Sequence, residues 1–200
     1  MSRQLILVRH GETLHNVAGI AQGWADSELS DRGREQVARL GERLRRHNPD
    51  ALFASPLGRA LTTAKAISDI LGLPITVLED LREMSYGGWE SRSFLDIRRD
   101  DAGVYERWIA DADVKSPEGE SHNDVRRRME RAFDAVRHAE RPVLVTHGTA
   151  IRIGATALLG VPTLTSRHFA QDNAAINLFF WRSDRWVLKV WNDTSHCEER

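Results

Sequence analysis

Two short apolar runs that end in the same way constrain the fold of this chain more than any other feature. Val8-Arg9-His10-Gly11 and Val145-Thr146-His147-Gly148 each place a histidine and a glycine at the end of such a run. Apolar runs too short for a helix are typical of strands that are buried on both faces of a parallel sheet. Because ligands bind beyond the carboxyl ends of the strands in open α/β sheets, both histidines are expected at the edge where a site forms.

Extended and helical patterns alternate along the first part of the chain. A strand at 5–8 is followed by an amphipathic helix over 31–46, a strand over 51–54 and a helical stripe over 57–71. Pro56 is expected in the first turn of that second helix. The alternation predicts an α/β domain built around a parallel sheet. Further elements are predicted as strands over 74–78 and 142–146, as a helix over 149–159, and as a terminal hairpin over 174–181 and 186–191.

The stretch from 84 to 119 breaks this alternation. Charged residues are interleaved there with Trp89, Phe94, Tyr105 and Trp108, and no strand pattern is present. We therefore expect a helical insertion that forms a lid over one end of the sheet, and we expect this lid to select the substrate.

A further helix is predicted to begin after Ser121. Ser121 and Asp124 have the spacing of a capping residue and a first-turn acid. The arginines at 126–128 point in different directions on a helix, and a solvated surface is the expected role for them. No site role is expected for the histidines at variable or helix-surface positions, which are His15, His47, His122, His138 and His168.

Composition narrows the class of protein. The 200 residues, 41% of them hydrophobic, favour one domain spanning residues 1–200. A formal net charge of -1 provides no overall field to attract nucleic acid or an anionic membrane. Cys197 is the only cysteine, which excludes an intramolecular disulfide and a cysteine zinc cluster. The first apolar run is too short for a secretory signal or a spanning helix, so a cytoplasmic location is expected.

Two arginines near the strand ends indicate that the site binds an anion. Arg9 and Arg59 each lie at or just after the end of a predicted strand. Both are permanently charged and shaped for bidentate contact with phosphate or carboxylate. The helix that starts after Gly148 adds backbone donors. The side chains of Thr13 and Asn16 can donate further hydrogen bonds to phosphoryl oxygens.

A neutral imidazole in such a setting can attack phosphorus. Nearby guanidinium charge disfavours imidazolium and keeps the ring of His10 neutral. The other histidine can donate to the phosphoryl oxygens, and from the pattern alone His10 and His147 are interchangeable in these roles. Gly11 is expected to let the chain approach the ligand closely.

A leaving alkoxide needs a proton, and Glu83 is the candidate donor. It follows the strand predicted over 74–78 and opens the glycine-rich, aromatic segment 84–89. Its expected role is general acid, and then general base for water. An ordinary surface carboxylate is the alternative that the sequence leaves open.

Several short blocks of the chain, taken in order, carry a family resemblance. These blocks are Leu7-Val8-Arg9-His10-Gly11-Glu12-Thr13 with Asn16, Leu29-Ser30 with Gly33, Ser55-Pro56-Leu57-Gly58-Arg59-Ala60 with Thr63-Ala64, Glu83, Gly119-Glu120-Ser121, and Val145-Thr146-His147-Gly148. Together they resemble the histidine phosphatase superfamily, the phosphoglycerate mutase-like group. The match runs over nearly the whole chain, and the tail at 192–196 resembles that of the small phosphatases in the group.

The resemblance implies a fold and assigns roles. It implies a three-layer α/β/α sandwich with a mainly parallel central sheet and the helical lid. It also implies that His10 is the nucleophile and Glu83 the proton donor, which settles the ambiguity between the histidines. The catalytic and phosphate-binding residues are then expected to be Arg9, His10, Thr13, Asn16, Gln22, Gly23, Arg59, Glu83, His147 and Gly148.

The expected function is hydrolysis of small-molecule phosphate monoesters through a phosphohistidine, by a phosphoric monoester hydrolase of the histidine acid phosphatase type. No metal and no cofactor is expected. The expected partner is a small-molecule phosphate ester, not nucleic acid or a membrane, and a homodimer is left open. The lid departs from many relatives at Tyr86 and Ser91, so the resemblance leaves the identity of the ester open.

Three other functions remain as alternatives. A bisphosphoglycerate-dependent phosphoglycerate mutase is favoured by Tyr86 and by arginines in the lid, but Glu83 lacks the basic residue that follows it in the mutases. A metal hydrolase could use His10, His147 and Glu83 as ligands, but the neighbouring arginines would repel a divalent cation. A module that binds a phosphorylated ligand or protein without turnover is the third alternative.

Overall fold

The computed structural model describes residues 3–198 and confirms the α/β prediction. Within these residues a six-stranded sheet has the order β3-β2-β4-β1-β5-β6. The β3-β2-β4-β1 part is parallel, whereas β5 and β6 are antiparallel to their neighbours. The strands are β1 (Gln4–Arg9), β2 (Ala51–Ala54), β3 (Ile75–Val77), β4 (Pro142–Thr146), β5 (Ile176–Arg182) and β6 (Arg185–Asp193).

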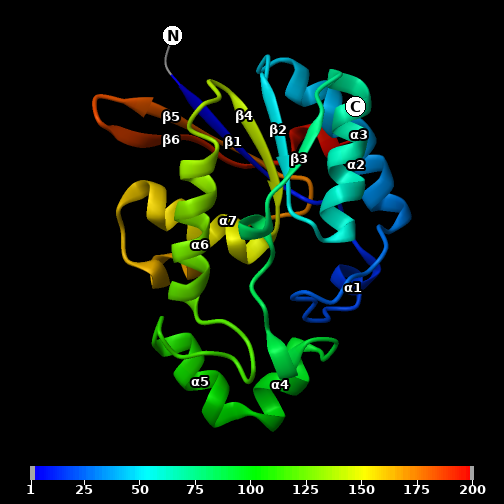
Figure 1. The fold of residues 1–200 in the computed structure, drawn as a ribbon. Helices are drawn as coiled ribbons and strands as arrows, with labels where there is room; N and C mark the ends of the chain where they lie inside the picture. The colour runs from blue at the N-terminus through cyan, green and yellow to red at the C-terminus, as the bar shows by residue number, and fades with distance from the viewer. Residues whose placement is uncertain (1–2, 199–200) are drawn as a thin grey trace.

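Helices cover both faces of the sheet, as the three-layer prediction requires. Figure 1 shows α2 and α3 on one side of the strands and α6 and α7 on the other. These helices are α2 (Asp31–Arg45), α3 (Gly58–Leu71), α6 (His122–Ala135) and α7 (Gly148–Leu159). Successive residues of β1 serve opposite layers: Leu5 and Leu7 pack with the α6 and α7 side, and Ile6 and Val8 with the α2 and α3 side. The apolar runs are therefore strands buried on both faces.

The lid segment is helical and lies at the carboxyl end of the parallel strands, at the lower end of the molecule in Figure 1. Its elements are η2 (Gly87–Trp89), α4 (Phe94–Asp100) and α5 (Ala102–Ala110). Trp89, Tyr105 and Trp108 pack against one another with ring centroids 5.4 to 6.1 Å apart. These three of the aromatic residues that interrupted the strand pattern thus form the core of the lid, whereas Phe94 is exposed.

Short elements complete the chain. They are α1 (Leu14–Val17), η1 (Glu79–Leu81), η3 (Thr163–His168) and η4 (Ser195–Cys197). The predicted hairpin is β5 and β6, and Ser183 and Asp184 in its turn have φ values of 43° and 77°. Two residues with positive φ match the right-handed twist of the paired strands. Within the described residues, no helix has the length and apolar character needed to span a bilayer.

The start of α3 differs from the prediction. Pro56 precedes the N-cap residue Leu57 instead of lying in the first turn. The cap comes from a distant loop, because Asp26 accepts hydrogen bonds from the backbone N–H groups of Gly58 and Arg59. A side chain more than thirty positions away in the sequence fixes this boundary, and no local pattern reports it.

Packing gives Gly11 a role that the sequence did not predict. Gly11 packs against α2: a Cβ on Gly11 would lie 2.6 Å from the side chain of Val37. Two further expectations are wrong, because Arg128 and His122 are buried although both were expected on the surface of α6. The predicted cap of α6 is confirmed, since Ser121 and Asp124 form a reciprocal capping box.

Candidate active site

A pocket of about 260 Å³ is located where β1 and β4 end and the lid begins. Most of the residues predicted for the phosphate site line it, namely Arg9, His10, Asn16, Gln22, Gly23, Arg59, Glu83 and Gly148. The remaining lining residues are Tyr86, Phe94, Thr149, Arg152, Phe169, Ala170 and Gln171. The pocket is thus built by the strand ends, the lid, the start of α7 and the loop after η3.

His10 follows β1, and one of its two ring nitrogens is hydrogen-bonded while the other is free. Its Nδ1 lies 2.7 Å from the carbonyl oxygen of Gly11, which only accepts, so Nδ1 carries the proton and donates. Nε2 then keeps its lone pair. Burial, the Arg59 charge and the Arg9 charge lower the pKa of His10 well below 6.5, so the ring is neutral at physiological pH.

His147 follows β4, and its ring lies tilted beside that of His10. The two ring centroids are 5.1 Å apart at an interplanar angle of 58°. Nε2 of His147 is 2.8 Å from the hydroxyl of Ser55, while its Nδ1 is buried without a partner. Burial, followed by the charge of Arg59, lowers the pKa of His147. The two strand-His-Gly units therefore bring the two imidazoles together, as the sequence predicted, although only His10 is among the residues that line the pocket.

Arg59 is buried at the start of α3 and braced by the loop at 23–26. Its guanidinium donates to the carbonyl oxygens of Gly23 and Ala25 at 2.7 and 2.9 Å and contacts Asp26 at 3.3 Å. The Nε atom of Arg59 is buried without a partner. A buried donor without a partner beside a pocket is a group available to a ligand.

Arg9, like Arg59, has a buried donor that is available to a ligand. It donates to the backbone oxygen of Gln171, and its Nε is buried without a partner. A Cβ on Gly148 would lie 3.3 Å from the guanidinium of Arg9, so glycine at this position allows close packing. The arginine thereby lies against the N-terminus of α7, where backbone N–H groups and the helix dipole favour an anion.

Glu83 is 8% exposed and is not a surface carboxylate. One carboxyl oxygen accepts from the backbone N–H of Met84 and of Ala150, at 2.8 and 3.0 Å. The other accepts from the N–H of Thr149 at 3.1 Å. The acid is therefore docked on the N-terminus of α7 and also lines the pocket. The alternative of an ordinary surface acid is wrong.

Thr13 does not line the pocket but orients two residues that do. It forms the capping box of α1 with Asn16, and its hydroxyl lies 3.0 Å from the side-chain oxygen of Asn16 and 3.1 Å from that of Gln22. The hydroxyl has a single proton and can donate to only one of these oxygens at a time. The side-chain oxygen of Asn16 also accepts from the backbone N–H of Thr13 and from Asn173, which leaves the amide nitrogen of Asn16 free to donate to a ligand.

Among the polar lining residues outside the predicted set, Arg152 and Gln171 had been given no role from the sequence. Arg152 lies four residues after Gly148 on the predicted helix, and this spacing places it on the same face, so a signal was available. Gln171 belongs to a loop without periodic pattern, and nothing in the sequence pointed to it.

The arrangement can bind an anion of phosphate size next to a neutral nucleophile and a carboxyl group. Guanidinium, amide and backbone donors converge on one pocket whose nucleophilic nitrogen is free. Among residues 3–198, no group of three or more His, Cys, Asp or Glu side chains is arranged to hold a metal ion.

Nearly the whole chain matches a known protein family. The model of the histidine phosphatase superfamily (branch 1) matches residues 5–194. The protein named "Probable phosphoglycerate mutase GpmB" of Erwinia tasmaniensis is 33% identical over an alignment 206 residues long. This alignment covers 98% of this chain and 95% of that protein.

Solved structures agree with this match. The alpha-ribazole phosphatase of Shigella flexneri is 30% identical, covers 96% of each chain and superposes with a TM-score of 0.85. A mycobacterial glucosyl-3-phosphoglycerate phosphatase is 32% identical, with 95% and 98% of the two chains covered and a TM-score of 0.86. Relatives of this chain are thus named as phosphatases and as a mutase. Sequence, fold and family model coincide over almost every residue, and the chain belongs to the histidine phosphatase superfamily.

Proposed function

We propose that this protein is a phosphatase that hydrolyses small-molecule phosphate monoesters in the cytoplasm through a phosphohistidine formed on His10. The observation that carries the proposal is the hydrogen bond from Nδ1 of His10 to the carbonyl oxygen of Gly11. This bond leaves Nε2 unprotonated in a pocket that Arg9 and Arg59 also line. A free imidazole lone pair beside two guanidinium groups suits attack on a phosphoryl group.

The reaction proceeds in two transfers. In the first, Nε2 of His10 forms a bond to phosphorus while the ester P–O bond breaks, and Glu83 donates a proton to the leaving oxygen. In the second, water attacks phosphorus, Glu83 takes a proton from it, and the P–N bond breaks to release phosphate. Arg9, Arg59 and His147 stabilise the charge on the equatorial oxygens in both transfers.

Replacement of His10 tests the nucleophile. His10→Ala is expected to abolish turnover of p-nitrophenyl phosphate, because no other lone pair takes its place. Wild-type enzyme quenched during turnover is expected to carry an acid-labile, alkali-stable phosphoryl group on His10, measured by peptide mass spectrometry at neutral pH. A phosphoryl group found only on serine or aspartate contradicts the proposal. Turnover that persists with a chelator present separates the proposal from a metal hydrolase, and absence of turnover favours a binding module.

A phosphoglycerate mutase is the second candidate, and one observation favours it. Tyr86 and a third arginine, Arg152, line the pocket, and a mutase needs added cationic groups to retain a bisphosphorylated intermediate. The test supplies 3-phosphoglycerate with and without 2,3-bisphosphoglycerate and follows phosphate and 2-phosphoglycerate together. We expect phosphate release to dominate. Isomer exchange that depends on the bisphosphate and outpaces phosphate release establishes the mutase.

A further inference from the structure

The pocket extends past the groups assigned to the phosphoryl transfer. Two polar side chains with no part in that chemistry, Arg152 and Gln171, line it together with the aromatic rings of Tyr86, Phe94 and Phe169. This wall combines α7, the lid and the loop after η3. It is the part of the pocket that the leaving group has to occupy once the phosphate site is filled.

Arg152 lies close to the proton donor. One of its terminal nitrogens donates to the hydroxyl of Thr149 at 3.0 Å, and the backbone N–H of Thr149 donates to Glu83 at 3.1 Å. Within residues 3–198, no carboxylate forms an ion pair with Arg152. A guanidinium in a pocket without a counter-ion is a group for an anion on the ligand.

Gln171 supplies an independent observation. Its side chain is 9% exposed, and neither its amide oxygen nor its amide nitrogen has a hydrogen-bond partner. Buried amides are almost always hydrogen-bonded, so an exception in a pocket wall marks a ligand contact. The backbone oxygen of Gln171 accepts from Arg9, which fixes this loop to the phosphate site.

Arg9 and Arg59 lie in the pocket with His10 and contribute to its lowered pKa, so both are assigned to the transferred phosphoryl group. Arg152 is held instead at Thr149, in the first turn of α7. Its guanidinium is therefore available to a second charge on the substrate.

We infer that Arg152 and Gln171 form a subsite for a carboxylate on the leaving group, so that the preferred substrates are phosphate esters of small hydroxy acids. A carboxylate accepts from both the guanidinium and the amide, and the pocket of about 260 Å³ limits the ester to a small molecule. The inference rests on the proposed phosphatase activity and adds the substrate class to it.

Matched esters test this subsite in the wild-type enzyme. The first pair is 3-phosphoglycerate and glycerol 3-phosphate, which differ in a carboxylate against a hydroxymethyl group. The second pair is O-phosphoserine and O-phosphoethanolamine. The carboxylate member of at least one pair is expected to have a kcat/KM about 10- to 100-fold higher, as for a charge-assisted hydrogen bond. Equal or inverted values in both pairs overturn the inference, and this result needs no variant.

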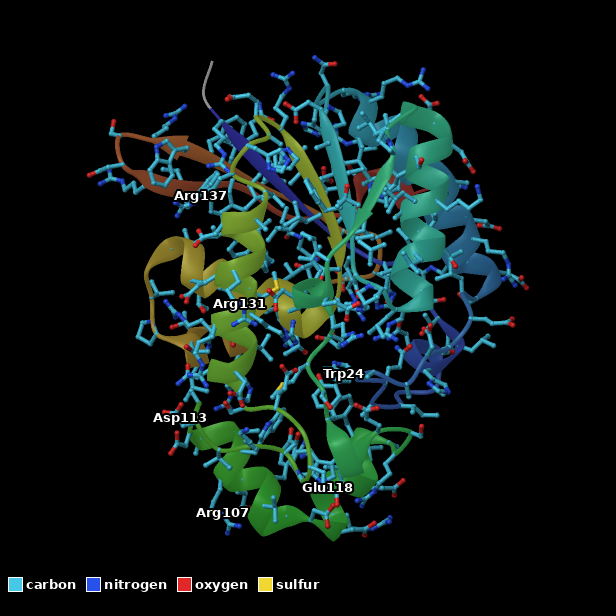
Figure 2. The ribbon with its side chains drawn as sticks, viewed as in Figure 1. Trp24, Arg107, Asp113, Glu118, Arg131 and Arg137 are labelled. Atoms are coloured by element: carbon cyan, nitrogen blue, oxygen red, sulfur yellow. The ribbon has the colours of Figure 1, made fainter. Side chains whose placement is uncertain are left out.

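Arg152→Met identifies the residue responsible. It is expected to lower kcat/KM for the carboxylate ester by about 10- to 100-fold, mainly through KM, and to cause a smaller loss for its partner ester. Gln171→Leu is the second variant. It is also expected to lower kcat/KM for the carboxylate ester, and it tests the subsite if Arg152→Met does not fold. Arg137→Met is the control for loss of a surface arginine, because Arg137 lies just past the end of α6 that is far from the lid (Figure 2). Equal losses on both esters refute the subsite. Wild-type turnover of p-nitrophenyl phosphate tests the proposed phosphatase separately.

A different observation concerns the loop that carries Glu83. Arg128 is 6% exposed, and it donates to the backbone oxygens of Asp80, Arg82 and Glu83 at 3.0, 2.6 and 2.9 Å. It also forms a two-fold contact with the carboxylate of Glu120, at 2.9 and 3.0 Å.

Glu120 completes the clamp from the other side of Glu83. Its carboxylate accepts from the backbone N–H of Ser85 at 2.8 Å. Arg128 and Glu120 thus bind the chain immediately before and after the residue that donates the proton. A fork of donors with fixed geometry sets the position of a loop more tightly than a single flexible ammonium can.

The geometry assigns Arg128 as a positioning residue that holds the carboxyl of Glu83 at the N-terminus of α7 for proton transfer. Arg128 does not line the pocket, so it acts on the reaction through Glu83. Loss of Arg128 should therefore impair the steps that need the proton and spare those that do not.

The test compares alkyl and aryl esters, because only a poor leaving group needs protonation. Glu83→Gln is expected to slow kcat on an alkyl ester such as 3-phosphoglycerate about 10²- to 10⁴-fold, with a smaller effect on p-nitrophenyl phosphate. Arg128→Met is expected to show the same selectivity at a smaller magnitude. In Glu83→Gln/Arg128→Met, the alkyl ester should lose no more than in Glu83→Gln alone.

Two further variants keep this test decisive. Arg128→Lys keeps the charge but not the fork, and it should show the same alkyl-selective loss if Arg128→Met fails to fold. Arg131→Met is the matched control: Arg131 lies on the same helix (Figure 2), and its guanidinium pairs with Asp80 at 2.6 Å, whereas the hydrogen bond to the backbone oxygen of Glu83 comes from Arg128. Equal losses on both ester types, or additive losses in the double variant, show a structural role alone and overturn the assignment.

Discussion

Three buried histidines make the stability of the protein depend on pH. Burial and neighbouring arginines lower the pKa of His10 and His147, and burial lowers the pKa of His122 to about 4. Each is neutral in the folded protein but protonates near pH 6.5 in the unfolded chain. Below pH 6.5 the unfolded state therefore binds more protons. The full stability is present above this pH and is lost as the pH falls towards each folded-state pKa.

We expect the free energy of unfolding to fall between pH 7.5 and pH 5.5, by about 1.4 kcal/mol in total for each histidine that stays neutral in the folded protein. Urea denaturation at both pH values measures this. His122→Phe keeps an aromatic ring against Trp108, whose ring centroid lies 4.6 Å from that of His122. This variant should lose less unfolding free energy between the two pH values than the wild type, by the contribution of one histidine. Equal stability of the wild type at both pH values would falsify the neutral assignment.

Site residues could be predicted from the sequence where they lie directly after the end of a strand. His10, His147 and Arg59 follow strand ends, so the periodic pattern located them without knowledge of packing. Arg128 could not be placed in this way, because its burial depends on backbone oxygens 45 to 48 positions away. The role of His10 as nucleophile and of Glu83 as acid came from the family resemblance, and both remain proposals.

At the scale of elements, the loop after β1 and the helix α2 approach each other through glycine. A Cβ on Gly33 would lie 2.0 Å from the backbone oxygen of Glu12, and a Cβ on Gly11 would lie 2.8 Å from the oxygen of Gly33. Both backbones meet with no room for a side chain. This contact fixes the loop that continues from His10 to Asn16.

Gly33→Ala is expected to destabilise the protein by about 1–3 kcal/mol, because the atoms that its Cβ would meet all belong to the backbone of Glu12 and cannot move aside as a side chain could. It should also reduce turnover by displacing Asn16. Gly103→Ala is the matched control with the opposite sign: its Cβ meets nothing within 4 Å, and alanine in α5 should stabilise by about 0.5 kcal/mol. Chemical denaturation of the two variants measures both changes in unfolding free energy. Equal changes would contradict a close contact between Gly33 and the backbone of Glu12.

Element boundaries were less predictable than the elements themselves. The apolar stripes of α2 and α3 and the strands β1, β2 and β4 follow from periodicity, because each buries a repeating set of side chains. The predicted strand at 74–78 is shorter in the structure, since the chain turns into η1 at Glu79. Such ends depend on caps and turns formed with remote residues.

At the scale of the whole molecule, alternation of strands and helices predicted a parallel sheet but not its order. The observed order β3-β2-β4-β1-β5-β6 places the first strand next to β4 and β5. Local patterns carry no information about which distant strand pairs with which, and the family resemblance supplied the architecture. The comparison with solved structures confirms it at TM-scores of 0.85 and 0.86.

This strand order has a consequence for synthesis on the ribosome. β1 is translated before every other strand, yet its two partners begin at Pro142 and Ile176. At about 5–20 residues per second, roughly 9–35 s pass before the second partner is complete. During that interval the apolar run 5–8 lacks at least one of its two neighbours, and until His147 has been translated Arg9 and His10 cannot meet it. We expect ribosome-stalled chains shorter than about 180 residues to be protease-sensitive at β1 and inactive, and folding of this enzyme to begin around β2 and β3, whose pairing needs only the first half of the chain.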